Sequence, residues 1–317
     1  RVVGMIGESF IFAFLNVAFV VVISPFFMMV VKKVKARVQG RQGPHLLQGY
    51  YNLAKLFRKE TLYSEYAGCI SRIAPYAALS ILLVAAVMVP IFWIPEQELV
   101  TANIIVFLYL LVTGRLLIAL LGLDAASTFG GMGSSREMSL SAIIEPVTVV
   151  VFAALVYVTG SFSIHDIFRT ATTMFPAYNP TVLLLSVPLF ILIIVETGRV
   201  PVDNPETHLE LTMVHEGMLL DTSGRNLALF ELSHAVKQTL LMAILLNIIL
   251  PAGIALEMSA GVLILGGVLF LLKGTVLCVI IGLFESAYAK MRFFQIPNLF
   301  MIAFFFSILT IFIEVML

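Results

Sequence analysis

The chain has 317 residues, of which 60% are hydrophobic and 12% are charged, and its formal net charge at pH 7 is zero. Because soluble globular domains carry about 25% charged residues, this composition excludes an ordinary soluble protein and predicts an integral membrane protein. The balanced charge gives no sign of nucleic-acid binding, and two cysteines, Cys69 and Cys278, cannot hold an iron–sulfur cluster, which takes four thiolates, so any electron chemistry is expected in another subunit.

Eight apolar runs approach the length of about 20 residues that an α-helix needs to cross a bilayer. They lie at 8–31, 70–92, 99–121, 138–160, 180–196, 227–250, 260–284 and 296–316. Continuous apolar runs exclude the alternating pattern of a membrane β-barrel, so each run is expected to be a helix. The sequence therefore predicts an all-α, multi-pass membrane protein, with residues 1–317 forming a single membrane domain.

Basic residues are concentrated between the first and second runs. They are Lys32, Lys33, Lys35, Arg37, Arg41, Lys55, Arg58 and Lys59, together with Arg72 at the very start of the second run. By the positive-inside rule this stretch is expected to face the cytoplasm, which puts the loops at 122–137, 197–226 and 285–295 on the same side. Eight crossings then leave both termini outside.

The first cytoplasmic loop, ARVQGRQGPHLLQGYYNLAKLFRKE, turns at Gly43-Pro44 and continues with helical periodicity. Its apolar side holds Leu46, Leu47, Tyr50, Leu53, Ala54 and Phe57, and its basic side holds Lys55, Arg58 and Lys59. We predict an amphipathic helix that lies along the membrane surface. It either anchors the chain to lipid or serves as a docking shelf for a soluble partner, and periodicity alone favours neither.

The loop after the third run, LDAASTFGGMGSSRE, contains three glycines. A phosphate-binding loop would need a preceding strand and the full glycine spacing. Because this segment has neither, we predict a flexible cytoplasmic turn. Ser134 or Ser135 is expected to cap the next helix, with Glu137 in its first turn.

The stretch ETGRVPVDNPETHLELTMVHE, residues 196–216, gathers acidic residues directly after the fifth run. Pro201 and Pro205 forbid a continuous helix, and Asn204 is a suitable cap for a new helix starting at 205. Three glutamates of that helix fall within an arc of about 120° that also holds apolar residues, so they are expected to line a polar cavity. They are Glu206, Glu210 and Glu216.

The two histidines of the same stretch, His208 and His215, are expected to point away from the glutamates. Seven residues along a helix correspond to a rise of about 10.5 Å, which is too far for one metal ion to bridge. We therefore predict polar contacts for both histidines and no metal site.

Ionisable side chains also occur inside the apolar runs, where each costs about 2.5–3.5 kcal/mol to insert and is a functional candidate. They are Arg115, Glu145, Glu196, Glu231, His234, Lys237 and Lys273. A structural ion pair would explain Arg115 or Lys273 alone. So many together predict a relay that passes protons through water-filled gaps.

These residues resemble a known family, the eight-helix membrane subunit shared by respiratory complex I and energy-converting membrane-bound [NiFe] hydrogenases. The most specific part is the pattern E-T-x-R-x-P-x-D-x-P-E, carried by Glu196, Thr197, Arg199, Pro201, Asp203, Pro205 and Glu206. The ARVQGRQGP turn, Leu123-Asp124 with Ser135-Arg136-Glu137, and Glu145-Pro146 also match. The resemblance covers essentially the whole chain.

Two segments favour the hydrogenase branch of this family, which includes formate hydrogenlyase. Gly43-Pro44 reaches Leu46-Leu47-Gln48 almost directly, whereas the quinone-reducing relatives usually have extra residues there. The segment FESAYAKMRF, residues 284–293, resembles the hydrogenase pattern F-E-N/S-x-x-A-x-x-R. The sequence departs at LLDTSG from the S-E-Y-S-G ending of some formate-linked members, which leaves the electron donor open.

The resemblance implies a membrane anchor and coupling subunit of a group 4 [NiFe] hydrogenase-type complex in the cell membrane of a bacterium or archaeon. The chain would bind no cofactor or metal, because the [NiFe] centre and iron–sulfur clusters would belong to hydrogenase large, small and iron–sulfur subunits on the cytoplasmic side. Antiporter-like membrane subunits would adjoin it. The implied ion-coupling path, for protons or sodium, is Glu137, Glu145, Glu196, Asp203, Glu206, Glu210, Glu216, Glu231, His234, Lys237 and Lys273, and the implied soluble-arm interface is Arg37, Arg41, Arg136, Arg199 and Asp203.

Two related functions stay open. One is the quinone-site subunit of a complex I, in which the same cavity would admit a quinone, and the other is a sulfur-reducing relative of the hydrogenase complex. A stand-alone secondary transporter would also explain interior charges. Such transporters are usually built from two paired halves, which this sequence does not show.

Overall fold

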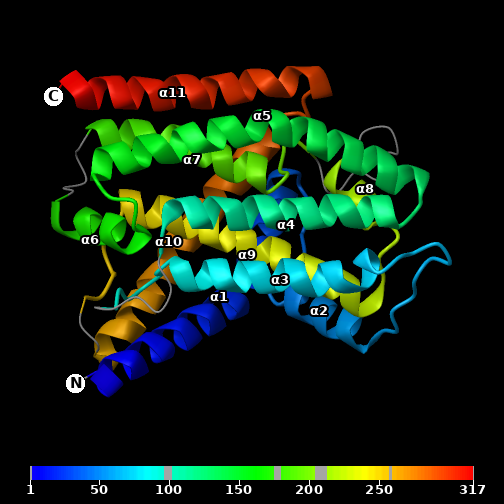
Figure 1. Ribbon diagram of the computed structural model, residues 1–317, viewed down its shortest axis with the longest axis horizontal. Coiled ribbons are helices and arrows are strands. Elements are labelled where there is room, and N and C mark those ends of the chain that lie inside the picture. Colours follow the sequence, from blue (N-terminus) through cyan, green and yellow to red (C-terminus); the bar gives the residue numbers. More distant parts are fainter. Residues whose placement is uncertain (1, 96–101, 175–179, 204–212, 257–258, 317) are drawn as a thin grey trace.

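The computed structural model describes residues 2–95, 102–174, 180–203, 213–256 and 259–316, most of which are helical (Figure 1). The helices are α1 (Val2–Val38), α2 (Gln48–Arg58), α3 (Ile70–Met88), α4 (Ile104–Asp124), α5 (Thr128–Thr159), α6 (Ile164–Met174), α7 (Pro180–Glu196), α8 (His215–Leu219), α9 (Gly224–Ile249), α10 (Ala260–Ala287), the 3₁₀ turn η1 (Phe293–Gln295) and α11 (Ile296–Met316). Seven of these are long and apolar enough to cross a membrane, and α7 is a shorter apolar helix. The predicted all-α, multi-pass architecture is confirmed.

Helix α9 is the centre of the bundle. It contacts α1, α2, α3, α6, α7 and α10, and 78% of its apolar stretch is buried, the largest share among the seven candidate spans. Its C-terminal half, from Leu240 to Ile248, packs into one core with Phe27 of α1, Phe107 of α4 and Phe270 of α10. Lipid tails are as apolar as these side chains, so close packing is what holds such helices together.

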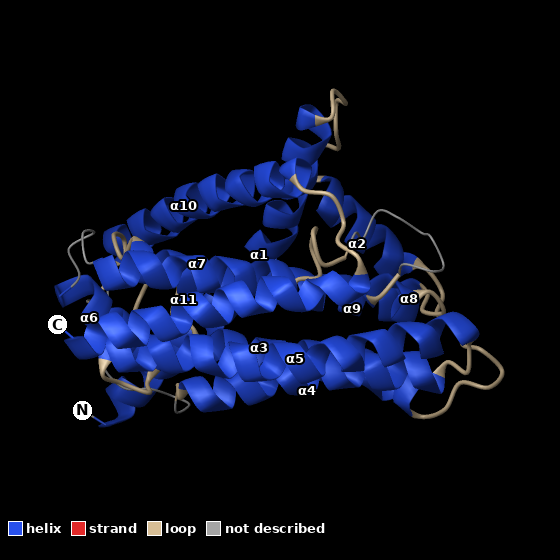
Figure 2. Ribbon diagram, turned by 90° about the horizontal axis from the view of Figure 1, so that it is seen from above, coloured by secondary structure: helices blue, strands red, loops and turns tan. Residues whose placement is uncertain are grey.

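The short helices α2 and α8 lie at the end of the bundle opposite the start of α1 and the end of α11 (Figures 1 and 2). Helix α2 confirms the predicted amphipathic helix and is seated on α1. The Tyr50 hydroxyl donates to the Val22 carbonyl of α1. Gly49 lies so close to α1 that an added Cβ would be 3.1 Å from the Pro25 carbonyl oxygen.

The connection between α4 and α5 corrects the prediction of a flexible loop at 122–137. Helix α5 already begins at Thr128, where the Ser127 side chain accepts a hydrogen bond of 3.0 Å from the Gly130 N–H. Ser134 and Ser135 therefore do not cap this helix, and Glu137 lies in its third turn rather than its first.

Close packing explains why this glycine-rich segment is helical. A Cβ on Gly133 would come within 2.9 Å of the Val214 carbonyl oxygen, so the first turns of α5 lie directly against the segment leading into α8. Ser134 is buried and donates to the Ala119 carbonyl of α4 at 2.8 Å. Each glycine costs a helix about 1 kcal/mol relative to alanine, and these contacts offset that cost.

Helix α6 was not predicted. It follows α5 and lies near the two ends of the chain (Figure 2). Ile164, Ile167, Phe168 and Ala171 recur at helical spacing and are buried. That spacing is the signal from which the helix could have been predicted, although it is too short to cross a bilayer.

Candidate functional site

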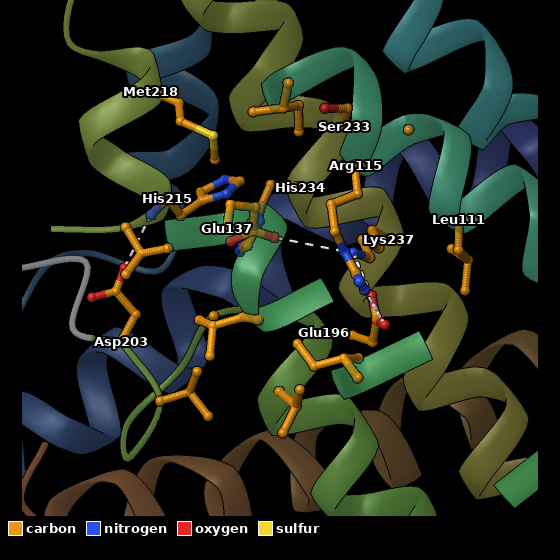
Figure 3. Close-up of a pocket in the computed structure, with 18 of the residues that line it drawn as sticks. Leu111, Arg115, Glu137, Glu196, Asp203, His215, Met218, Ser233, His234 and Lys237 are labelled. Carbon is orange, nitrogen blue, oxygen red and sulfur yellow. Dashed lines mark hydrogen bonds and ion pairs between the residues drawn. The ribbon is translucent and has the colours of Figure 1, made fainter. Parts of the chain in front are cut away.

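A cavity of about 50 Å³ lies between α3, α4, α5, α7, α8 and α9. Its charged and imidazole lining consists of Arg115, Glu137, Glu196, Asp203, His215, His234 and Lys237 (Figure 3). Apolar side chains such as Leu111 and Met218 complete the wall. The bundle thus encloses a polar site that is assembled from six helices and the turn after α7.

The first ionic cluster is centred on Arg115 of α4. One of its terminal nitrogens donates to Glu196, the other donates to the Ser141 hydroxyl at 3.1 Å, and Nε lies 3.6 Å from a Glu137 carboxylate oxygen. Lys237 Nζ lies 2.7 Å from the second Glu196 oxygen. Two cations thus face two anions, which offsets the several kcal/mol that desolvating each buried charge costs.

The second ionic cluster is centred on Arg199. Its guanidinium donates to the Glu285 carboxylate of α10 at 2.6 Å and to the Gln238 side-chain oxygen of α9 at 2.5 Å. Lys35 Nζ of α1 lies 3.8 Å from the other Glu285 oxygen. This cluster joins α1, α9 and α10 to the turn after α7.

A third pair, Asp203 with Lys290, holds the start of α8. Lys290 Nζ donates to one Asp203 oxygen at 2.7 Å, and the other oxygen accepts from the backbone N–H of His215 at 3.2 Å. A carboxylate at this position satisfies a backbone N–H that has no partner within the helix and complements the helix dipole.

The turn after α7 explains how one short segment supplies all three clusters. The Arg199 N–H donates to the Ile194 carbonyl at 3.0 Å, and the Gly198 N–H donates to the Val195 carbonyl at 3.1 Å. Gly198 has a φ of 53°, in the left-handed region that favours glycine. This is the Schellman pattern of helix termination, and it turns Glu196 and Arg199 toward different neighbours.

A second cavity, of about 160 Å³, adjoins the first. Its titratable and charged lining residues are Lys32, Lys35, Arg199, Asp203, His215, Glu216, Glu231, His234 and Glu285, and its apolar wall includes Pro25, Met28, Leu53 and Phe230. Gly198, Asp203, His215 and His234 line both cavities. The two spaces therefore meet at these four residues.

The structure brings together most of the residues predicted for the ion-coupling path. Glu137, Glu196 and Lys237 share the first cluster, and Asp203, Glu216, Glu231 and His234 line one or both cavities. Glu145 is half-buried on α5 and lines neither cavity. Glu206 and Glu210, with the helix start predicted at 205, lie outside the described residues.

Lys273 is separate from these residues. Its ammonium donates to the carbonyls of Leu250 and Ala252 at 2.7 and 2.8 Å, just beyond the C-terminal end of α9. At 1.5 Å per residue, Leu250 is about 20 Å along α9 from Lys237. The expected single path through Lys273 is not formed by the described residues.

The residues predicted for a soluble-arm interface divide into two groups. Arg37 and Arg41 are exposed at the end of α1, whereas Arg136 is half-buried and donates to the Met213 carbonyl at 2.9 Å. Arg199 and Asp203 are only 4% and 3% exposed. Because both already pair with residues of this chain, they are interior residues here, which corrects the expectation of a surface role.

Four members of the ionic clusters were missed in the sequence: Lys35, Gln238, Glu285 and Lys290. Glu285 directly follows the apolar run 260–284, as Glu196 ends an earlier run. An acid at the end of an apolar run was therefore an available signal. Nothing in the sequence indicates that Glu285 pairs with Arg199, 86 residues away.

His215 contacts another histidine. Its ring centroid is 5.2 Å from that of His234 on α9. In the part of the chain that the structure describes, no group of three or more His, Cys, Asp or Glu side chains is arranged to hold a metal ion. His208 lies outside that part.

Comparison with known proteins identifies one sequence family and two similar proteins from Escherichia coli. Residues 11–316 match the sequence family described as NADH dehydrogenase. The chain is 31% identical over 292 residues to Hydrogenase-4 component C of Escherichia coli, covering 92% of this chain and 91% of that protein. It is 28% identical over 278 residues to Formate hydrogenlyase subunit 4 of the same species, covering 87% and 89%.

Two further similarities are more distant. The chain is 28% identical over 234 residues to a subunit of the NADH-quinone oxidoreductase of Symbiobacterium thermophilum, covering 68% of each protein. A chain of the membrane-bound sulfane sulfur reductase, an archaeal respiratory membrane complex, superposes with a TM-score of 0.81 over 97% of this chain and 99% of that one. At 17% identity this likeness shows a shared fold.

Proposed function

We propose that this chain, which belongs to the NADH dehydrogenase family, is the membrane anchor and coupling subunit of a group 4 [NiFe] hydrogenase-type complex. It links electron transfer in the soluble arm to the movement of protons or sodium. The observation that carries the proposal is that Glu196, Arg199 and Asp203, within one short segment, enter three ion pairs around two joined cavities, two of them buried. Similarity to Hydrogenase-4 component C over nearly the whole chain favours the hydrogenase branch.

Electrostatics gives the coupling its physical basis. At an effective dielectric constant of 20, two unit charges 4 Å apart interact by about 4 kcal/mol. A change of charge or position beside the second cavity, where Arg199 and Glu285 pair, therefore alters which group nearby holds a proton. The turn from Glu196 to Asp203 carries such a change between clusters, because all three pairs are attached to it.

The exposed basic end of α1, with Arg37 and Arg41, supports a cytoplasmic docking surface for the hydrogenase large, small and iron–sulfur subunits. The chain lies in the cell membrane with both termini outside and antiporter-like subunits beside it. The [NiFe] centre and iron–sulfur clusters belong to the partners. Cys69 is exposed and Cys278 is buried, so this chain's two thiols do not form a shared site.

Affinity purification of the tagged chain from its own membranes in mild detergent tests this function. We expect the purified complex to contain nickel and to couple hydrogen turnover to an ion gradient after reconstitution in vesicles. A complex that lacks nickel and only reduces quinone would contradict the proposal.

The quinone-site function is the second candidate, favoured by the partly apolar second cavity and by the similarity to the NADH-quinone oxidoreductase relative of Symbiobacterium thermophilum. The volume of this cavity, about 160 Å³, is smaller than the roughly 300–1,000 Å³ that encloses a drug-sized ligand. Inhibition of turnover by quinone-site inhibitors would support this candidate, and the hydrogenase-type function predicts none.

A further inference from the structure

His215 and His234 occupy the place where the two cavities meet. Of the four residues that line both spaces, Gly198 has no side chain and Asp203 is engaged by Lys290 at 2.7 Å. The two imidazole rings have centroids 5.2 Å apart and are tilted by 41° to one another. They come from different helices, α8 and α9, and Figure 3 shows them between Asp203 and the Arg115 cluster.

The position of His215 is fixed by contacts that are independent of its ring. Its backbone N–H donates to Asp203, and the segment entering α8 packs on Gly133 of α5, where a Cβ would be 2.9 Å from the Val214 oxygen. The ring itself is half-buried and faces both cavities. The His215 ring is therefore fixed next to His234 of α9 and still borders both cavities.

We infer that His215 and His234 form the proton-transfer junction between the two cavities, an inference that rests on the proposed coupling function. In the step, an N–H bond of one protonated ring breaks and a nitrogen of the other ring accepts the proton, directly or through one water, with no electron transferred. Each ring returns to its neutral form by passing the proton onward. When the proton moves from the second cavity to the first, Glu231 donates it to one ring and Glu137 accepts it from the other ring, and these roles exchange in the reverse direction.

The cavity volumes support a hydrated route on both sides. One water needs about 10–15 Å³ of accessible space and two to four polar partners. The cavities of about 50 and 160 Å³ exceed this and are lined by carboxylates and cations. Water in each cavity would then connect the rings to Glu137 and Glu231, which line the two cavities.

The test uses the intact complex in inverted vesicles, with hydrogen turnover and proton uptake measured together. We expect His215→Gln and His234→Gln each to lower proton uptake per hydrogen by about tenfold or more, since a positioned acid or base contributes about 10²–10⁴-fold to a rate. His165→Gln, which removes a buried imidazole of α6 that lines neither cavity, is the matched control and should keep the wild-type ratio. If both junction variants take up as many protons per hydrogen as the wild type, the inference is overturned and the proposed function still stands. If the wild-type complex moves no ions, the proposed function itself is overturned.

Chemical rescue separates proton transfer from packing. In His215→Ala, added imidazole should restore at least part of the proton uptake, and thiazole, a ring of similar shape but much lower basicity, should not. Equal rescue by both compounds, or rescue by neither together with normal assembly, contradicts a proton-transfer role. Assembly is checked by co-purification of the nickel-containing subunit.

Discussion

Lys237 and Lys273 each place an ammonium group inside a long apolar helix, and the structure gives them different surroundings. Lys237 pairs with Glu196 at 2.7 Å, beside a cavity and within a four-residue ionic cluster. Lys273 donates to the carbonyls of Leu250 and Ala252, where α9 has ended. Carbonyls at a helix end need partners in a membrane, so Lys273 has a structural role as their donor. Lys237 instead belongs to an ion-paired cluster that lines a cavity.

This difference shows that the position of a charged residue within a membrane span does not by itself indicate a function. The groups that contact the charged side chain determine how much free energy a change in its protonation or pairing costs. A lysine held by two carbonyls has a fixed role as donor. A lysine that shares a carboxylate with an arginine belongs to a set whose protons and charges can redistribute.

The largest expected effect comes from Glu196→Gln, which leaves Arg115 and Lys237 facing each other without their shared anion. Breaking a buried ion pair by removing one partner costs about 3–5 kcal/mol. We expect a clear loss of thermal stability, measured by the temperature at which the detergent-solubilised complex aggregates. Adding Lys237→Met should recover part of this loss because it removes one unpaired cation, and further destabilisation by the second change would contradict the cluster.

Lys273→Met should lower stability by about 1.5–3 kcal/mol, the value of hydrogen bonds from a charged donor. Lys273→Arg keeps the donors and is the control. Both variants should move as many ions per hydrogen as the wild type. A selective loss of ion movement in Lys273→Met with unchanged stability would remove the distinction between the two lysines.

Gly133→Ala tests the packing that positions α8 beside the first cavity. The added methyl group meets the Val214 oxygen at 2.9 Å, and overpacking of this kind typically costs about 1–3 kcal/mol. Gly131→Ala is the matched control, because a Cβ there has nothing within 4 Å and should instead gain up to about 1 kcal/mol of helix propensity. Equal melting temperatures for the two variants would argue against close contact between α5 and the start of α8.

The sequence predicted the helices well because their signal is local. Apolar runs, the Gly43-Pro44 turn and the basic α1–α2 region each depend on neighbouring residues, and the corresponding elements are present. The glycine-rich start of α5 could not be predicted from propensity. Its helix is stabilised by contacts of Gly133 and Ser134 with segments that are distant in sequence.

The candidate site was predicted in its residue types but not in its pairing. Glu196, Arg199 and Asp203 stand out in an apolar chain, and all three are at the cavities. Their partners Lys237 and Glu285 come from α9 and α10, and Lys290 comes from the segment after α10. Single-sequence periodicity carries no information about which cation meets which anion. For the same reason Lys273 was grouped with a path from which the structure separates it.

Glu137→Gln is expected to change the structure little and ion movement strongly. It therefore tests most directly the claim that the Arg115 cluster couples electron transfer to ion movement. The Glu137 oxygen is 3.6 Å from Arg115 Nε and its side chain is 16% exposed. Because Arg115 keeps Glu196 as a partner, we expect a smaller loss of stability than the roughly 3–5 kcal/mol of Glu196→Gln. The decisive measurement is the number of ions moved per hydrogen in vesicles that carry wild-type, Glu137→Gln or Lys273→Met complex. We predict that the number of ions moved per hydrogen falls in the Glu137→Gln complex and equals the wild-type number in the Lys273→Met complex. An unchanged number in Glu137→Gln would contradict the coupling role of the Arg115 cluster.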